Sequence, residues 1–213
     1  MSGCGCSHGT VFEGLSAGYR RVLWVVIALN ATMFAVELTA GLAAQSMALK
    51  ADALDFLGDS LTYAVSLWVI GRPLRWRATA ALAKGISLAV MGTAVLAMTL
   101  WRVFVLGQPD EFVMGGVGAL AFAVNVASAL LLLRYRNGDA NVRSVWLCSR
   151  NDAIGNLAVI AAALAVGATA SAWPDLVVAA IMAGLFLSSA TRIVRQAMGE
   201  LRSTGSAPAA ETA

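Results

Sequence analysis

The chain has 213 residues, of which 59% are hydrophobic and only 13% charged, and its formal net charge is +3. Soluble domains are about 25% charged, so this composition excludes an ordinary water-soluble domain. It also excludes a nucleic-acid-binding module, which would need a basic face on a soluble fold. A membrane span needs roughly 20 apolar residues, and the chain has room for about six of them.

Residues 1–19 are predicted to form a cytoplasmic N-terminal tail. The polar start MSGCGCSHGT does not resemble the basic region of a secretory signal, so we expect it to be retained. The tail contains a short thiol and imidazole cluster, Cys4, Cys6 and His8, of a kind that can capture a soft metal ion. The cluster lacks the second ligand pair of a closed zinc site, so an uncommitted disordered tail is the alternative.

Six apolar windows follow in chain order, at residues 22–43, 47–70, 79–101, 112–133, 144–167 and 175–194. They predict an all-α membrane protein in which residues 20–197 form a bundle of six transmembrane helices. Residues 198–213 are small and polar towards their end, STGSAPAAETA, and are predicted to form a disordered cytoplasmic tail. The sequence contains no nucleotide-binding loop of the form G-x-x-x-x-G-K-[ST], so no ATP-driven step is expected.

Basic residues in alternate connections predict the orientation. They are Arg20, Arg21, Arg72, Arg75, Arg77, Arg134, Arg136, Arg143, Arg195 and Arg202. The other connections, at residues 44–46, 106–111 and 168–174, contain no Lys or Arg. By the positive-inside rule both termini are cytoplasmic, and we expect a multi-pass protein of a bacterial-type inner membrane.

The second window contains the segment ADALDFLGD, residues 51–59, which places three carboxylates where lipid is expected. Each ionisable group near the bilayer centre costs about 2.5–3.5 kcal/mol. With about 3.6 residues per turn, Asp52, Asp55 and Asp59 share one helix face. They cannot all stay ionised unless they bind cations, take up protons or pair with Lys50 or Arg150.

The fifth window contains a second pair at the same spacing, Cys148 and Asp152, and Asn156 continues the stripe. Side chains four residues apart are neighbours on one helix face, so two facing pairs can surround one ion. Together with Asp55 and Asp59, this pair offers three carboxylates and one sulfur, which suits tetrahedral coordination of Zn²⁺. A site that alternates between a metal ion and protons belongs to a metal–proton exchanger.

Simpler interpretations compete for several of these residues. Polar groups also hold membrane helices together, which explains one or two polar residues better than three acids on two helices. Buried cysteine is often a small hydrophobic side chain, so Cys148 is either a ligand or a packing residue. Asp52 and Glu37, the latter in the first window, are candidates for a proton relay, for indirect support of the ligands or for salt bridges. Asn156 is either a helix–helix hydrogen-bond donor or a metal contact.

Three segments resemble the cation diffusion facilitator family, and the resemblance extends over about residues 20–202. They are MFAVELTAGLAAQSMALKADALDFLGDSL, CSRNDAIGNLAVI and WPDLVVAAIMAGLFLSSATRIV. The resemblance implies a six-helix transport fold whose metal site is formed by two residues on the second helix and two on the fifth. Matched to this sequence, the four ligands are Asp55, Asp59, Cys148 and Asp152.

The same resemblance implies the cargo and the assembly. Members of this family move Zn²⁺, and in some branches Cd²⁺, Co²⁺, Fe²⁺ or Mn²⁺, out of the cytoplasm in exchange for protons, usually as homodimers. The position of Cys148 is usually His in the zinc branch, and a softer thiolate favours Zn²⁺ or Cd²⁺ over Mn²⁺. Most members have a cytoplasmic metal-sensing domain after the sixth span, and we expect this chain to lack it.

The sequence therefore predicts a secondary active transporter for divalent metal ions, not an enzyme, with no prosthetic group. An intramembrane aspartyl protease would have a G-x-G-D signature. The nearest stretch here, residues 56–59, reads FLGD and does not match it. A Ser–His mechanism is excluded because His8 is the only histidine and lies in the tail. A channel or structural membrane subunit is the remaining alternative, although a channel favours rings of charge over a four-ligand cage.

Overall fold

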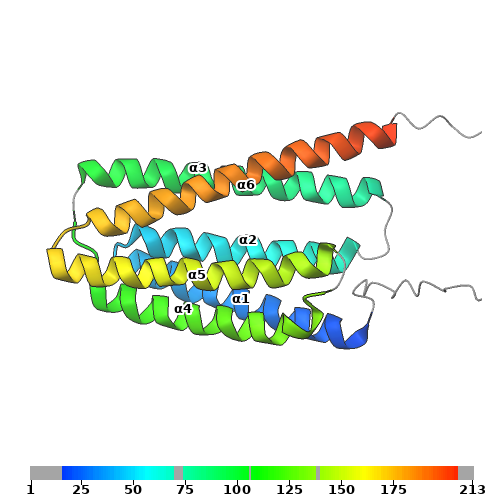
Figure 1. Cartoon of the computed structure of the whole chain (residues 1–213). Coiled ribbons are helices and arrows are strands. Elements are labelled where there is room, and N and C mark those ends of the chain that lie inside the picture. The colour runs from blue at the N-terminus through cyan, green and yellow to red at the C-terminus, as the bar shows by residue number, and fades with distance from the viewer. Residues whose placement is uncertain (1–15, 70–73, 106, 138–139, 206–213) are drawn as a thin grey trace, which may run out of the picture.

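In a computed structural model, which describes residues 16–69, 74–105, 107–137 and 140–205, the chain is a bundle of long helices (Figure 1). These ranges contain six α-helices and one short 3₁₀-helix: α1 (Ala17–Ala43), α2 (Met47–Val69), α3 (Leu74–Phe104), α4 (Glu111–Leu132), η1 (Leu133–Tyr135), α5 (Ala140–Thr169) and α6 (Trp173–Gly205). Each predicted apolar window coincides with one of the α-helices. The prediction of an all-α bundle is confirmed.

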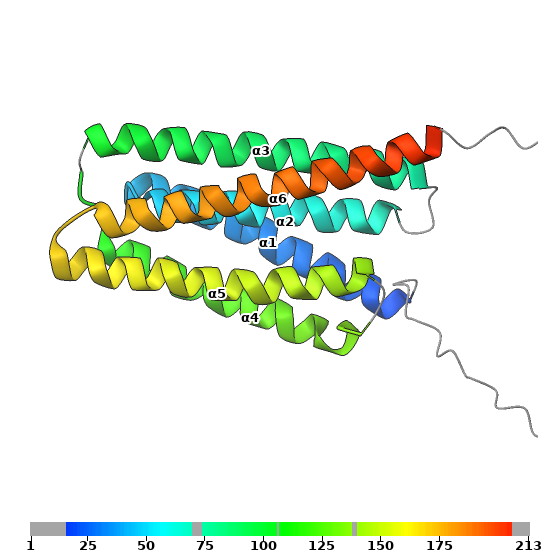
Figure 2. The ribbon, with the colours of Figure 1, turned by 45° about the horizontal axis from the view of Figure 1, so that its top comes forward.

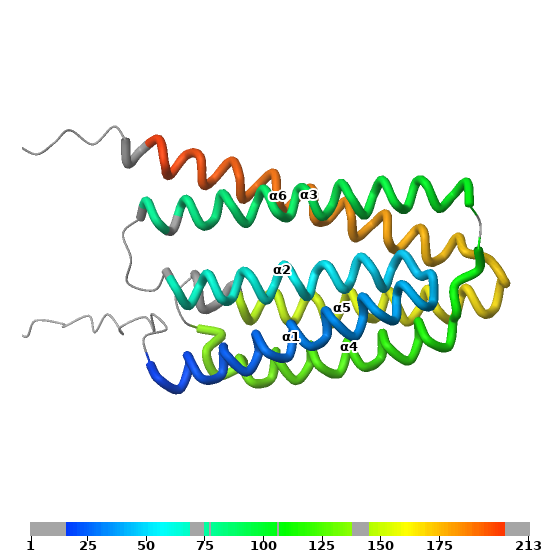
Figure 3. The backbone as a smooth tube through the Cα atoms, turned by 180° about the vertical axis from the view of Figure 1, so that it is seen from behind, coloured from blue at the N-terminus to red at the C-terminus, as the bar shows by residue number. Residues whose placement is uncertain are grey.

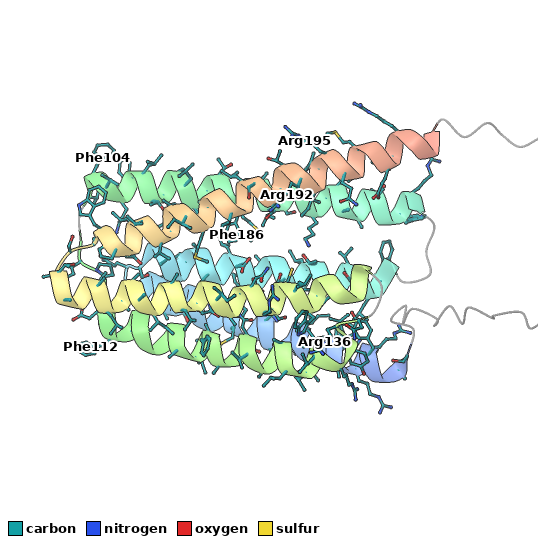
Figure 4. The ribbon with its side chains drawn as sticks, in the orientation of Figure 1. Phe104, Phe112, Arg136, Phe186, Arg192 and Arg195 are labelled. Carbon is teal, nitrogen blue, oxygen red and sulfur yellow. The ribbon has the colours of Figure 1, made fainter. Side chains whose placement is uncertain are left out.

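The helices have the length and surface of membrane spans. Among the described residues, α1, α3, α4, α5 and α6 each contain a stretch long and apolar enough to cross a bilayer. α2 has 23 residues, about 35 Å of helix, but also carries Lys50 and three aspartates. Large apolar side chains face outwards, including Phe104 and Phe112, which are 85% and 84% exposed at one end of the bundle (Figure 4). The protein is a multi-pass integral membrane protein.

The helices form two groups. α1, α2, α4 and α5 pack as a four-helix bundle, and α3 and α6 form a closely packed pair along one side of it (Figures 1 and 2). α2 and α5 contact both groups: α2 touches α1, α5, α3 and α6, and α5 touches α2, α4 and α6. Seen from behind, α1 runs beside α2 while the α3–α6 pair stands to one side (Figure 3).

Glycines allow α3 and α6 to approach closely. A Cβ atom on Gly85 would lie 2.7 Å from Cγ2 of Val194, and one on Gly92 would lie 3.0 Å from Cβ of Phe186. Both distances are too short for a larger residue without a shift of the helices. Small residues at such positions are typical of membrane helix pairs, whose association depends on close packing. The pair therefore behaves as one packed unit.

A buried carboxylate joins α6 to the start of α2. Asp175 accepts hydrogen bonds from Oγ of Ser46 at 2.5 Å, from N of Met47 at 2.7 Å and from N of Ala48 at 3.0 Å. Its side chain is only 1% exposed. An acidic side chain at a helix N-terminus satisfies unpaired N–H groups and complements the helix dipole. This contact holds α2 and α6 together at the end of the bundle opposite to the start of α1.

The terminal helices extend beyond the predicted boundaries of the transport domain. α1 begins at Ala17, where Oγ of Ser16 accepts a hydrogen bond from N of Tyr19 at 3.2 Å. α6 continues to Gly205, so residues 198–205 are helical where a disordered tail was predicted. Good helix formers and a Gln196–Glu200 hydrogen bond at 2.9 Å across one turn explain the extension. Cys4, Cys6 and His8 lie outside the described residues.

Candidate metal centre

A cavity of about 600 Å³ opens where the α3–α6 pair separates from the four-helix bundle. Its walls come from α2, α3, α5 and α6. The polar or ionisable residues that line it are Asp52, Asp55, Asp59, Thr62, Lys84, Ser87, Cys148, Asn151, Asp152, Ser189 and Arg192. Figure 4 marks Phe186 and Arg192 on the stretch of α6 that forms one wall. All four predicted metal ligands therefore line a single cavity.

The two predicted ligands on α2 lie one turn apart in the middle of that helix. Asp55 is half-buried and Asp59 is 9% exposed, so both carboxyl groups are shielded yet border the cavity. Tyr63, one turn further on, donates a hydrogen bond to Oδ2 of Asp59. Asp55 and Asp59 both come within side-chain hydrogen-bonding reach of Asp152 on α5. The spacing that the sequence predicted thus brings each of the two aspartates of α2 close to Asp152 of α5.

The two predicted ligands on α5 lie one turn apart and face the cavity that α2 also lines. Cys148 is half-buried, lines the cavity and also packs against the apolar cluster that contains Tyr63. Asp152 is half-buried and faces the same space. Within the described residues, no three Cys, His, Asp or Glu side chains already converge as they would around a bound ion. The four predicted ligands therefore share one cavity without forming a preformed cage.

Asn156 is committed to hydrogen bonds between helices. Its Nδ2 donates to Oδ2 of Asp52 at 2.6 Å, and its Oδ1 accepts from Nδ2 of Asn125 at 2.9 Å. Of the two predicted roles for Asn156, the helix–helix donor is the one that the structure displays. The sequence analysis missed Asn125, although it is the single amide in the fourth apolar window. These three buried side chains join α2, α5 and α4.

Glu37 is fully buried, with 0% exposure, and neither of its carboxyl oxygens has a hydrogen-bond donor. It is not in a salt bridge, which was one of its predicted roles. Arg150, a predicted counter-charge, is exposed: its guanidinium lies 5.3 Å from the Trp146 ring and donates to Oδ1 of Asn151 at 3.1 Å. The predicted neutralisation of buried acids by Arg150 is therefore not observed.

The sequence analysis did not assign to this site its two basic residues, Arg192 on α6 and Lys84 on α3. Lys84 lines the cavity opposite α2 and α5. Its ammonium group interacts favourably with the charged forms of Asp55 and Asp59. A lysine inside an apolar window was the available sign of a role in the site. Whether its side chain faces the cavity depends on the rotation of α3 about its axis, which the sequence does not give. The cavity therefore contains a positive charge besides its carboxylates.

The sequence also matches a family of known proteins over most of its length. The model of the cation efflux transmembrane domain matches residues 23–201. The chain belongs to the cation efflux, or cation diffusion facilitator, family. The match covers α2 to α5, most of α1 and α6, and the whole cavity, so the family fold predicted from the three sequence segments is confirmed.

Individual relatives agree with this family. The metal cation efflux system protein CzcD of Cupriavidus metallidurans is 28% identical over 189 residues, which cover 83% of this chain and 60% of that protein. The cation efflux system protein CzcD of an Alcaligenes species is 28% identical over 182 residues, 80% of this chain and 57% of that protein. The zinc transporter ttm-1 of Caenorhabditis elegans is 38% identical over 82 residues, 38% of this chain and 20% of that protein. The chain spans less than two thirds of the length of these relatives.

Proposed function

We propose that the chain exports a divalent metal ion, with Zn²⁺ as the preferred cargo, in exchange for protons. The observation that carries the proposal is the meeting of two pairs, Asp55 with Asp59 and Cys148 with Asp152, at one cavity inside a membrane bundle. Membership of the cation efflux family supports the transport of metal ions. The printed names of two relatives as metal or cation efflux proteins, and of a third as a zinc transporter, support the choice of cargo.

The donor set favours a borderline or soft divalent ion. Three carboxylates and a thiolate can provide four ligands for tetrahedral Zn²⁺. The sulfur of Cys148 would disfavour Mn²⁺ and Mg²⁺, which prefer oxygen ligands and higher coordination numbers. Asp55 and Asp59 already approach Asp152, so rotation of side chains around the ion would complete the cage.

Protons are the natural counter-ions of such a site. Carboxylates crowded in a poorly hydrated cavity repel each other unless a cation or protons neutralise them. A metal ion binds only the deprotonated ligands, so loading the metal releases protons and protonation releases the metal. The same side chains would therefore bind one cargo on the way out and the other on the way back.

The position of the cavity along the helices favours one direction of loading. Its walls on α3 and α5 come from the halves of these helices that are nearer to the start of α1, and its walls on α2 and α6 come from the middle of these helices. Towards the other end, the buried cluster that includes Ala48, Leu49, Met114 and Val159 fills the bundle. If the termini are cytoplasmic, as the arginine pattern predicts, the cavity faces the cytoplasm and this is the loading state.

Exchange then requires the cavity to open on the other side. The close packing of α3 on α6 would let the pair move as one body against the four-helix bundle. The proposal also includes assembly as a homodimer, location in a bacterial-type inner membrane and cytoplasmic tails at both ends.

The proposal further includes capture of metal ions by the N-terminal tail, through Cys4, Cys6 and His8.

Metal uptake by proteoliposomes tests the proposal. Zn²⁺, Cd²⁺, Co²⁺ and Mn²⁺ would be supplied separately to vesicles containing the wild type, Asp59→Asn or Glu200→Gln. Glu200 lies on α6 outside the cavity and is the matched control for loss of a carboxylate. We expect Zn²⁺ and Cd²⁺ uptake in the wild type and in the control, and loss of both in Asp59→Asn. Equal uptake by all three proteins would contradict the assignment.

A further inference from the structure

The buried carboxyl group of Glu37 has no counter-charge in the described part of the chain, and the proposed metal site does not provide one. Glu37 lies about two turns before the end of α1, is completely buried and, among the described residues, has no donor for either carboxyl oxygen. It is also absent from the lining of the cavity, so a bound metal ion would not touch it. An ionised carboxylate without hydrogen bonds in such a place would be extremely costly, and a protonated carboxyl would not.

The near neighbour of Glu37 is a second carboxyl group. Asp52 on α2 is 1% exposed, and its side chain comes within hydrogen-bonding reach of Glu37. Ionised carboxylates are acceptors only, so two carboxyl groups can form a hydrogen bond only when one of them carries a proton. The contact between the two helices therefore has a place for one proton.

The other partners of Asp52 indicate how this proton is shared. Asn125 donates to Asn156, and Asn156 donates to Oδ2 of Asp52 at 2.6 Å. Asn156 thus donates directly to Asp52 and favours its ionised form, and Asn125 holds the Asn156 amide in that orientation. Glu37, which receives no such donor, is the group left to carry the proton and to donate it to Asp52.

No basic group on the helices packed against α1 replaces that proton. α1 packs on α2 and α4. α2 presents Asp52 and, further away, Asp55 as acidic neighbours of Glu37. α2 also carries Lys50, which lies against Gly41, one turn along α1 from Glu37. Among the described residues neither carboxyl oxygen of Glu37 has a hydrogen-bond partner, so Lys50 does not pair with it. After Glu111 at its start, α4 has no titratable residue. A Zn²⁺ ion held by Asp55, Asp59 and Asp152 would lie in the cavity, which Glu37 does not line, so metal loading would not displace the proton either.

We propose that Glu37 and Asp52 form a proton-binding site, separate from the four metal ligands, in which one proton is held between the two carboxyl groups. Asp52 also lines the cavity and Glu37 does not, so protons reach the site through Asp52. The bound proton links α1 to α2 and stays in place whether or not the cavity contains a metal ion. Only the statement that the proton stays in place when the cavity contains a metal ion rests on the proposed function.

Infrared difference spectroscopy at neutral pH tests the proposal. The carbonyl band of a protonated carboxyl group would be recorded for the purified wild type, Glu37→Gln and Glu200→Gln, each without metal and saturated with Zn²⁺. We expect a band that is present in the wild type and in Glu200→Gln, persists with Zn²⁺ and is lost in Glu37→Gln. Spectra of wild type and Glu37→Gln that do not differ in this band would overturn the proposal.

Thermal unfolding of the same proteins provides the second readout. A carboxyl group that keeps its proton in the folded protein and loses it on unfolding makes stability fall as the pH rises. Glu37→Gln has an amide that donates to Asp52 at every pH, so its unfolding temperature should depend less on pH than that of the wild type between neutral and alkaline pH. Equal pH dependence in both would overturn the proposal. If Glu37→Gln does not fold, Asp52→Asn replaces it, and an unchanged carboxyl band in that variant would equally overturn it.

These outcomes separate the two proposals. If the protein fails to bind or transport metal, the proposed function fails, yet the spectra recorded without metal still decide whether Glu37 holds a proton. If transport is observed and the band does not depend on Glu37, only the proton site is refuted.

Discussion

Tyr63 donates a hydrogen bond to the Asp59 carboxylate across one turn of α2. The phenol is fully buried, and its ring belongs to the apolar cluster beneath the cavity. Groups that orient a metal ligand commonly affect metal affinity by 10–100-fold when they are removed. The hydrogen bond therefore fixes the carboxylate that we place at the centre of the metal site.

Tyr63→Phe should weaken Zn²⁺ binding by about 10-fold, because Asp59 loses the donor that orients it. Isothermal titration calorimetry of the purified protein measures the change. Tyr135→Phe is a suitable control, since Tyr135 lies in η1 outside the cavity. Affinity within a factor of two of the wild type would show that this hydrogen bond serves packing alone.

Lys84→Met should strengthen Zn²⁺ binding by roughly 3–10-fold. The ammonium group lies in the cavity with the carboxylates, so it repels an incoming divalent cation and competes with it. Lys84→Arg keeps the charge and is the matched control, for which we expect a smaller change. Weaker binding in Lys84→Met would mean that the lysine supports the ligands and does not compete with the metal.

Cys148→Ser should lower Cd²⁺ affinity by at least about 10-fold while changing Mn²⁺ affinity little, because an alcohol is a harder and weaker ligand than a thiolate. Competition between the two metals during binding gives the ranking directly. A thiolate ligand would also give Co²⁺-loaded wild type a sulfur-to-metal absorption band that the variant lacks. An unchanged ranking and unchanged spectrum would identify Cys148 as a packing residue.

The sequence was most informative where a residue's role depends on its own helix. The spacing of four between Asp55 and Asp59, and between Cys148 and Asp152, fixes a shared face whatever the neighbours are. Apolar length similarly predicted all six helices. The aspartates on α2 were recognisable because their cost in a membrane is high enough to require a function.

Roles that depend on how helices are rotated and packed could not be predicted in the same way. Asn156 could face a metal or another helix, and only the position of Asn125 on α4 decides for the hydrogen bond. Arg150 is next to the ligand stripe in sequence but faces outwards. Asp175 lies 129 residues from Ser46, so no local pattern indicates that it caps α2.

Asp175→Ala should destabilise the protein by about 1–3 kcal/mol, because the buried N-terminus of α2 loses its hydrogen-bond acceptor. Thermal unfolding in detergent measures the loss, and Zn²⁺ affinity should stay close to that of the wild type because Asp175 is not in the cavity. Asp110→Ala removes an exposed cap from α4, where Asp110 accepts from Phe112 and Val113, and should cost less. Equal losses in the two variants would argue against a special role for the α2–α6 contact.

Proton movement driven by a zinc gradient alone tests most directly whether metal and protons exchange at these carboxylates. Zn²⁺ would be added outside proteoliposomes that contain a pH-sensitive dye, with no imposed pH gradient and with a potassium ionophore to collapse any voltage. We expect the lumen of wild-type vesicles to become alkaline as Zn²⁺ enters. In vesicles with Asp59→Asn we expect no Zn²⁺ entry and no change in internal pH. Zn²⁺ entry in the wild type without any change in internal pH would contradict metal–proton exchange.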